Sequence, residues 1–129
     1  MGSDLSVWMV RVGYALTGLS ALFFLMDATM KLLRLPVVLD TTAQLGWPTS
    51  SVVPLATILL GATLLYVWPK TNILGAIILT AYLGGAVATH ARIGSPLLTH
   101  TLFGAYIGLL MWGGIYLRDP SLRSIFPFR

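Results

Sequence analysis

The sequence has no cysteine, no glutamate and few charged residues of any kind. Without cysteine, the chain alone carries no thiol or disulfide chemistry. Only 9% of its 129 residues are charged, whereas 57% are apolar, and the mean hydropathy is +0.86. A soluble domain needs more charged surface than this composition supplies. The composition therefore predicts an integral membrane protein that has the lipid bilayer as its surroundings.

Basic residues outnumber acidic ones and give a formal net charge of +4. They occur singly and near the expected ends of helices, which favours phospholipid headgroups over nucleic acid as their partners. The first apolar segment is longer than the core of a signal peptide and has no clear cleavage site, so we expect no cleaved leader.

Four apolar stretches, at about residues 7–35, 52–68, 72–92 and 97–117, are each long enough to cross a bilayer. The uncharged part of the third, residues 72–89, would extend roughly 27 Å as a helix, close to the ~30 Å thickness of the hydrocarbon layer. The intervening residues 37–45 are too polar and too few to span, and they predict a short interfacial helix. We therefore expect an all-α, antiparallel four-helix membrane bundle in one domain, followed by a basic cytoplasmic tail at residues 118–129.

Small residues recur in the third and fourth spans. Ala81, Gly84, Gly85 and Ala88 share one side of a helix and predict a face against which another helix packs closely. Gly104 and Gly108 form a GxxxG motif, which permits helix association and a homo-oligomer but is common in apolar segments.

The basic residues also predict an orientation. Five are expected on the side of the termini and three on the other side, and the cytoplasmic side usually carries the excess. This places both termini in the cytoplasm of a multi-pass protein. The five are Arg11, Lys70, Arg118, Arg123 and Arg129, and the three are Lys31, Arg34 and Arg92.

The same topology collects polar side chains at the end of the bundle opposite the termini. They are Asp27, Lys31, Arg34, Asp40, His90, Arg92 and His100. A charge inside a span costs at least ~2.5 kcal/mol, so Asp27 should face the bundle and have a partner. Lys31, one helical turn away, is the local candidate, and Arg92 and His90 are the distant ones.

From this group we predict catalytic roles for Asp27, His90 and Arg92. The predicted ligand-binding residues are Lys31, Tyr82, Thr89 and His100. The alternatives remain open: Asp27 and Lys31 can form a simple ion pair, and the histidines can form a structural hydrogen bond between helix ends or bind a metal or haem. Two histidines without cysteine or glutamate make an incomplete zinc site, so no metal site is expected.

Four segments together resemble the DoxX-like family of small four-helix bacterial membrane proteins. They are MKLLRLP at residues 30–36, LGWP at 45–48, LGAIILTAYLGGAVATHARIGSP at 74–96 and YLRDPSLRSIFPF at 116–128. The resemblance covers roughly residues 7–128 and implies a four-helix fold in the bacterial inner membrane. The positions that match the family's pattern are Lys31, Gly46, Pro48, Gly84, Gly85, Thr89, His90, Arg92 and Gly94.

The family takes its name from a subunit associated with a quinone-reducing thiosulfate oxidase, which implies a lipophilic ligand and a redox-associated role. A quinone is then the favoured cofactor and haem the less favoured one, and the chain would need a bound redox group or a partner subunit. One alternative is a non-redox acid/base enzyme, of the isomerase or epoxide-opening type, acting on a lipophilic substrate. Another is a non-catalytic scaffold or accessory subunit of a membrane complex.

Overall fold

The computed structural model describes residues 2–127, and this part of the chain is built from helices and the turns between them. The elements are α1 (Gly2–Leu32), α2 (Pro36–Gln44), the 3₁₀ turn η1 (Thr49–Ser51), α3 (Val52–Val67), α4 (Asn72–Arg92), the π-helical turn η2 (Leu97–Thr101), α5 (Phe103–Arg118) and α6 (Pro120–Arg123). Four segments are long and apolar enough to cross a membrane: Leu5–Leu32, Thr49–Val67, Asn72–Arg92 and Leu97–Arg118. The predicted all-α membrane bundle with a short helix after the first span is thus confirmed. Arg129, counted above among the basic residues, lies outside the described residues.

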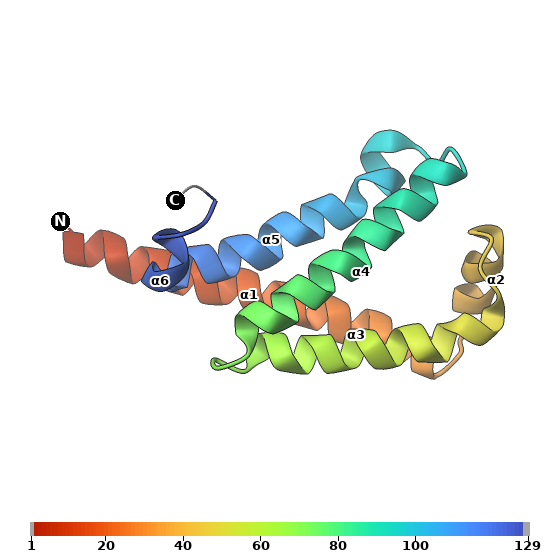
Figure 1. Cartoon of the computed structure of the whole chain (residues 1–129), viewed down its shortest axis with the longest axis horizontal. Coiled ribbons are helices and arrows are strands. Elements are labelled where there is room, and N and C mark those ends of the chain that lie inside the picture. The colour runs from red at the N-terminus through yellow and green to blue at the C-terminus, as the bar shows by residue number, and fades with distance from the viewer. Residues whose placement is uncertain (1, 128–129) are drawn as a thin grey trace.

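The four long helices form a ring in which α1 and α4 are opposite each other. Each of these two helices packs against both α3 and α5. Figure 1 shows the start of α1 and helix α6 at one end of the molecule, with α2 and η2 at the other. We call these the terminal end and the distal end.

The core is apolar and draws on all four long helices. Phe24, Leu59, Leu79 and Met111 are fully buried, one from each of them. The backbones of α1 and α5 approach closely, because a Cβ atom placed on Gly13 would lie 2.8 Å from the carbonyl oxygen of Gly114. Any larger residue at Gly13 would push the two helices apart.

The expected small-residue packing face on α4 is not used within the chain. Ala81, Gly84, Gly85 and Ala88 are all exposed, while Leu79 and Leu83 turn toward the core. Helix α4 instead packs closely through small residues nearer its start, where Gly75 and Ala76 are buried and a Cβ on Gly75 would collide with the backbone of Tyr66 on α3. The GxxxG motif does make a close contact inside the chain, since a Cβ on Gly104 would lie 3.0 Å from the carbonyl oxygen of Leu83.

Two helix boundaries at the distal end differ from the expectation. Helix α1 ends at Leu32 rather than at 35, because Arg34 takes a positive φ of 52° and Pro36 begins α2. The fourth span does not begin as a regular α-helix at residue 97. It opens with η2, where Thr101 and Leu102 donate backbone hydrogen bonds to the carbonyls of Pro96 and Leu97, five residues back.

Candidate functional site

The turn after α2 is attached to the distal end of α4. The Trp47 indole nitrogen donates a 3.2 Å hydrogen bond to the Thr89 hydroxyl, and Arg92 Nη2 donates a 3.3 Å bond to the carbonyl of Leu45. Gly46 lies between these contacts with a φ of +86°, and a Cβ placed on it would come 2.5 Å from Arg92 Nη2. Glycine is therefore required here for both its backbone angle and its lack of a side chain.

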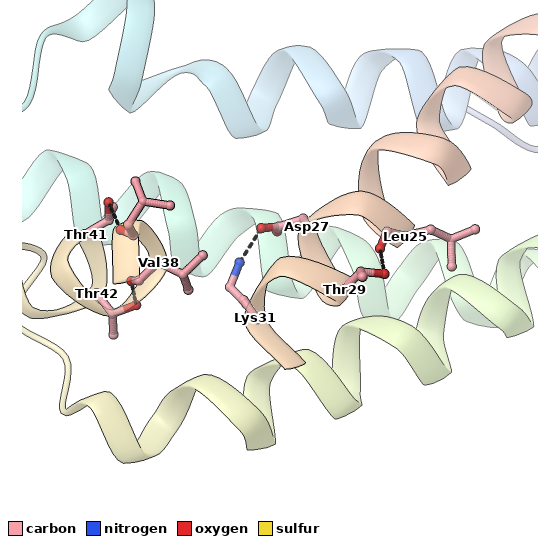
Figure 2. Close-up of polar contacts among 8 residues, drawn as sticks. Leu25, Asp27, Thr29, Lys31, Val38, Thr41 and Thr42 are labelled. Atoms are coloured by element: carbon pink, nitrogen blue, oxygen red, sulfur yellow. Dashed lines mark hydrogen bonds and ion pairs between the residues drawn. The ribbon is translucent and has the colours of Figure 1, made fainter. Parts of the chain in front are cut away.

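The Asp27 carboxylate forms an ion pair with Lys31 one turn further along α1, at 2.5 Å between Oδ1 and Nζ. Both side chains are part-buried, with 29% of Asp27 and 17% of Lys31 exposed. Figure 2 shows this pair on one side of α1, with the bond from Thr29 to the Leu25 carbonyl on another. Lys31 Nζ also lies 5.9 Å from the centre of the Tyr82 ring on α4, a cation–π distance. The local partner expected for Asp27 is therefore the one it has, and Tyr82 joins this group.

His90 and His100 lie side by side where α4 passes into η2. Their ring centroids are 6.1 Å apart and the ring planes make an angle of 61°. Each Nδ1 atom is within hydrogen-bonding distance of a neighbouring hydroxyl, Ser95 Oγ at 2.9 Å for His90 and Thr99 Oγ1 at 2.8 Å for His100. His90 is half-buried and His100 is exposed.

The predicted residues thus lie in the distal half of the bundle, with Tyr82 at the middle of α4, and they divide into three groups. Asp27, Lys31 and Tyr82 form the first, His90 and His100 the second, and Thr89 and Arg92 the third. Because successive residues on an α-helix are turned by about 100°, Tyr82, His90 and Arg92 project from different sides of α4. The sequence predicted a single cluster because it shows how far along its helix each residue lies, and so how deep in the membrane. It shows less directly to which side of the helix the side chain projects.

An apolar groove of about 870 Å³ runs between α4 and α5 on the outside of the bundle. Its volume is within the range of small-molecule sites, roughly 300–1,000 Å³. Helix α4, helix α5 and the residues after α6 all contribute to its walls. The lining residues are Thr80, Leu83, Gly84, Val87, Ala88, Gly104, Ala105, Gly108, Leu109, Trp112, Gly113, Tyr116, Phe126 and Pro127.

The chain after α6 folds back and closes the terminal end of this groove. The Phe126 ring stacks on Trp112 with centroids 5.2 Å apart and planes 20° from parallel. The Trp112 indole nitrogen in turn donates a 2.7 Å hydrogen bond to Thr80 on α4. Sequence reasoning did not identify Trp112, Thr80 or Phe126 as site residues. The aromatic sequence FPF near the end of the chain was the available indication of an apolar contact.

A second, smaller pocket of about 310 Å³ lies next to the groove, where α4 faces the turn after α2. The two share Ala88, and the smaller pocket is otherwise formed by Gly46, Trp47, Thr89 and Arg92. Arg92 has five N–H donors, and within residues 2–127 one hydrogen bond, to Leu45, uses them. The pocket next to this apolar groove therefore offers an indole, a hydroxyl and an exposed guanidinium. This arrangement suits a molecule with an apolar tail and a polar head.

Comparison with known proteins gives the family. No curated protein and no solved structure matches the chain. The family model described as the DoxX-like family matches residues 15–114, which is most of the chain and includes all four spans in whole or in part. The chain is therefore an integral membrane protein that belongs to the DoxX-like family.

Proposed function

We propose that this protein binds a lipophilic small molecule of the quinone type, with its apolar tail in the α4–α5 groove and its polar ring in the pocket at Arg92. The observation that carries the proposal is that the two pockets border the same residue, Ala88. A tail in the groove would bring the head of the ligand near Ala88, beside the pocket lined by Trp47, Thr89 and Arg92.

The chemistry of the groove and of the pocket at Arg92 supports placing the ligand's tail in the first and its head in the second. The groove is apolar along its length and open on the outside of the bundle, so a hydrocarbon chain can enter it from the membrane without crossing water. A guanidinium donates hydrogen bonds well to carbonyl oxygens, and the flat Trp47 indole offers a surface on which a ring can stack. A quinone has both the carbonyl oxygens and the ring.

The redox-associated role follows from the ligand and not from the protein's own side chains. The sequence has no cysteine, and within residues 2–127 no three His, Asp or Glu side chains come together. Electrons would have to move through the bound quinone and a partner subunit. This role therefore includes a membrane complex of which the protein is one component.

A non-redox acid/base enzyme is the second candidate, and the group formed by Asp27, Lys31 and Tyr82 favours it. Ionisable residues inside membrane spans are costly and mark functional sites by default. A carboxylate, an ammonium and a phenol in contact can exchange a proton with a substrate that reaches them. The groove runs along the outside of the bundle and its lining includes none of the three, so this candidate needs a different entry route.

The proposed location is the inner membrane of a bacterium, with both termini in the cytoplasm. Among the described residues, Arg11 belongs to the early part of α1, Lys70 to the turn between α3 and α4, Arg118 to the end of α5 and Arg123 to α6. Figure 1 shows these parts of the chain toward the terminal end. The absence of cysteine makes the orientation easy to test. We would label single cysteines at Ser124 and Thr49 in intact cells with a membrane-impermeant maleimide, and the proposal requires labelling at Thr49 alone.

The binding test uses two adjacent glycines of α4. Gly84 lines the groove and Gly85 does not, and a Cβ added at either position meets nothing within 4 Å. Gly84→Leu should therefore fill the groove without disturbing the fold, and Gly85→Leu is its matched control. We would titrate detergent-purified protein with a decyl-tailed benzoquinone and follow the quenching of tryptophan fluorescence.

The expected result is saturable quenching in the wild type and in Gly85→Leu. Gly84→Leu should weaken quinone binding at least about tenfold, because the leucine side chain occupies space that the quinone tail would otherwise fill. A tenfold change in affinity corresponds to about 1.4 kcal/mol. Arg92→Gln should weaken binding and leave thermal stability nearly unchanged. Equal affinities in Gly84→Leu and Gly85→Leu would show that the quinone does not use this groove.

A further inference from the structure

The two histidines at the junction of α4 and η2 take no part in the proposed quinone site. Neither His90 nor His100 lines the groove or the pocket at Arg92. Their rings nevertheless lie together, with centroids 6.1 Å apart, although ten positions separate them in the sequence. The pair therefore requires its own explanation.

We propose that His90 and His100 together bind one late first-row divalent metal cation, such as Zn²⁺ or Cu²⁺, through their Nε2 atoms. Imidazole nitrogen is a preferred ligand of both ions. This site is independent of the quinone proposal, because the two use different residues.

The hydrogen bonds of the rings support ligation through Nε2. A metal-binding histidine almost always uses its other ring nitrogen in a hydrogen bond that fixes the ring's orientation. Here both Nδ1 atoms are already engaged, by the hydroxyls of Ser95 and Thr99. Nε2 is the nitrogen that remains on each ring.

The separation of the rings is compatible with one shared ion. Zinc–nitrogen bonds are ~2.0–2.1 Å long, so the ion lies about 3 Å from the centre of each ring and two rings on one ion can have centroids up to about 6 Å apart. At the tetrahedral angle that Zn²⁺ usually adopts, the centroids would lie roughly 5 Å apart, so the observed 6.1 Å requires the two rings to move about 1 Å closer together. His100 is exposed, so its ring can turn toward His90 with little loss of packing.

The backbone at this junction holds the two rings in position. The Ser95 N–H donates to the His90 carbonyl at 3.0 Å, and the Thr101 hydroxyl donates to the Ser95 carbonyl at 3.1 Å. The π-helical turn Leu97–Thr101 carries His100, and π-helical turns occur frequently at functional sites.

The chemistry of the ligand set limits the kind of site. Within residues 2–127, no group of three or more His, Cys, Asp or Glu side chains occurs, so water would complete the coordination. Two neutral nitrogens and water suit an exchangeable ion rather than a closed structural zinc site, and they bind Cu²⁺ more tightly than Zn²⁺. The sequence analysis kept metal or haem binding by these histidines open as an alternative but expected no metal site, because two histidines without cysteine or glutamate make an incomplete zinc site.

The experiment is a titration of the detergent-purified, tag-free chain with ZnCl₂, followed by calorimetry and by two-dimensional NMR of ¹⁵N-labelled histidine side chains. We expect one Zn²⁺ per chain and changes in the Nε2 resonances of both histidines. His90→Gln and His100→Gln should each weaken binding at least tenfold, and Ser95→Ala should weaken it about tenfold through loss of the supporting hydrogen bond. With CuSO₄, the electron paramagnetic resonance spectrum should show two equivalent nitrogen ligands.

Two controls keep the result interpretable. His100 is exposed, so His100→Gln should leave the thermal unfolding temperature of the metal-free protein unchanged and cannot act through misfolding. The Zn²⁺ titration is also repeated in the presence of the decyl-tailed benzoquinone. The Zn²⁺ affinity should be the same with and without the quinone, because the two proposed sites use different residues. Zinc binding that persists unchanged in the His90→Gln, His100→Gln double variant, or Nε2 resonances that do not respond to zinc, would overturn the proposal.

Discussion

Trp47 and Thr89 are 42 residues apart in the sequence, and the indole nitrogen of the first donates a 3.2 Å hydrogen bond to the hydroxyl of the second. This bond connects the turn after α2 to the end of α4. Arg92, less than one helical turn beyond Thr89, binds the Leu45 carbonyl of the same turn. Two segments that carry the family resemblance, LGWP and THARIG, thus form one contact and border one pocket.

Gly46→Ala should weaken this contact, because the new methyl group would collide with the Arg92 guanidinium in a backbone conformation that already disfavours a side chain. The left-handed conformation alone costs about 1–2 kcal/mol. Gly94→Ala is the matched control, since Gly94 has a φ of +72° but open space around it. Thermal unfolding in detergent should show a larger loss for Gly46→Ala than for Gly94→Ala.

A double variant separates collision from backbone strain in the same experiment. In an Arg92→Ala background the guanidinium is absent. Gly46→Ala should then lower the thermal unfolding temperature no more than Gly94→Ala does. If Gly46→Ala destabilises the protein equally with and without the Arg92 side chain, residue 46 and Arg92 do not interact in the protein in its membrane.

The fold was predictable because it depends on properties that single residues carry. Four apolar stretches, proline and glycine between them, and the bilayer thickness together specify four antiparallel helices. The ion pair of Asp27 with Lys31 was predictable for a similar reason, since a spacing of four residues brings two side chains together on any α-helix.

The candidate site was harder to predict because it depends on how helices are rotated and where they cross. The groove exists because α4 turns Leu79 and Leu83 inward and leaves Gly84 and Ala88 outside. Its closed end depends on the return of Phe126 to Trp112, a contact between a span and the chain that follows α6. No local spacing rule connects those two aromatic residues.

Phe126→Ala should open the terminal end of the groove. Stacking with Trp112 contributes about 0.5–1.5 kcal/mol beyond buried area, so its loss should release the chain after α6. The measurement is quenching of Trp112 by brominated lipids, in a background where Trp8, Trp47 and Trp68 are Phe. Quenching should increase in Phe126→Ala and stay at the wild-type level in Ile125→Ala, whose side chain is 60% exposed. Equal quenching in both variants would contradict the closed end.

Tyr66→Phe should destabilise the bundle because it removes a buried hydroxyl that contacts Thr17 and Met111. The Tyr66 hydroxyl is buried between helices and donates to the Met111 carbonyl at 2.8 Å, so its removal should cost about 1 kcal/mol. Tyr106→Phe removes a bond of equal length, to the Leu98 carbonyl, at an exposed position where water or lipid headgroups can replace it. Denaturant unfolding should therefore show a clear loss for Tyr66→Phe and a smaller one for Tyr106→Phe.

The Asp27 and Lys31 pair allows the most informative stability experiment, because its two members should not be equivalent. Lys31→Met leaves the Asp27 carboxylate in a membrane span without its partner, and we expect a loss of about 1–2 kcal/mol, less than the ~2.5 kcal/mol of an unpaired charge at the bilayer centre. Asp27→Asn should cost less, because the long lysine side chain can extend to the headgroups. The double variant should recover most of the stability lost in Lys31→Met, since no charge then remains to be solvated.

Lys70→Met, at an exposed turn, is the control and should change the unfolding free energy by less than about 0.5 kcal/mol. If Lys31→Met lowers the unfolding free energy no more than Lys70→Met does, the Asp27 carboxylate must be solvated even without its lysine. The proton-exchange role considered for Asp27, Lys31 and Tyr82 would then lose its support, because that role assumes a charge buried in the membrane.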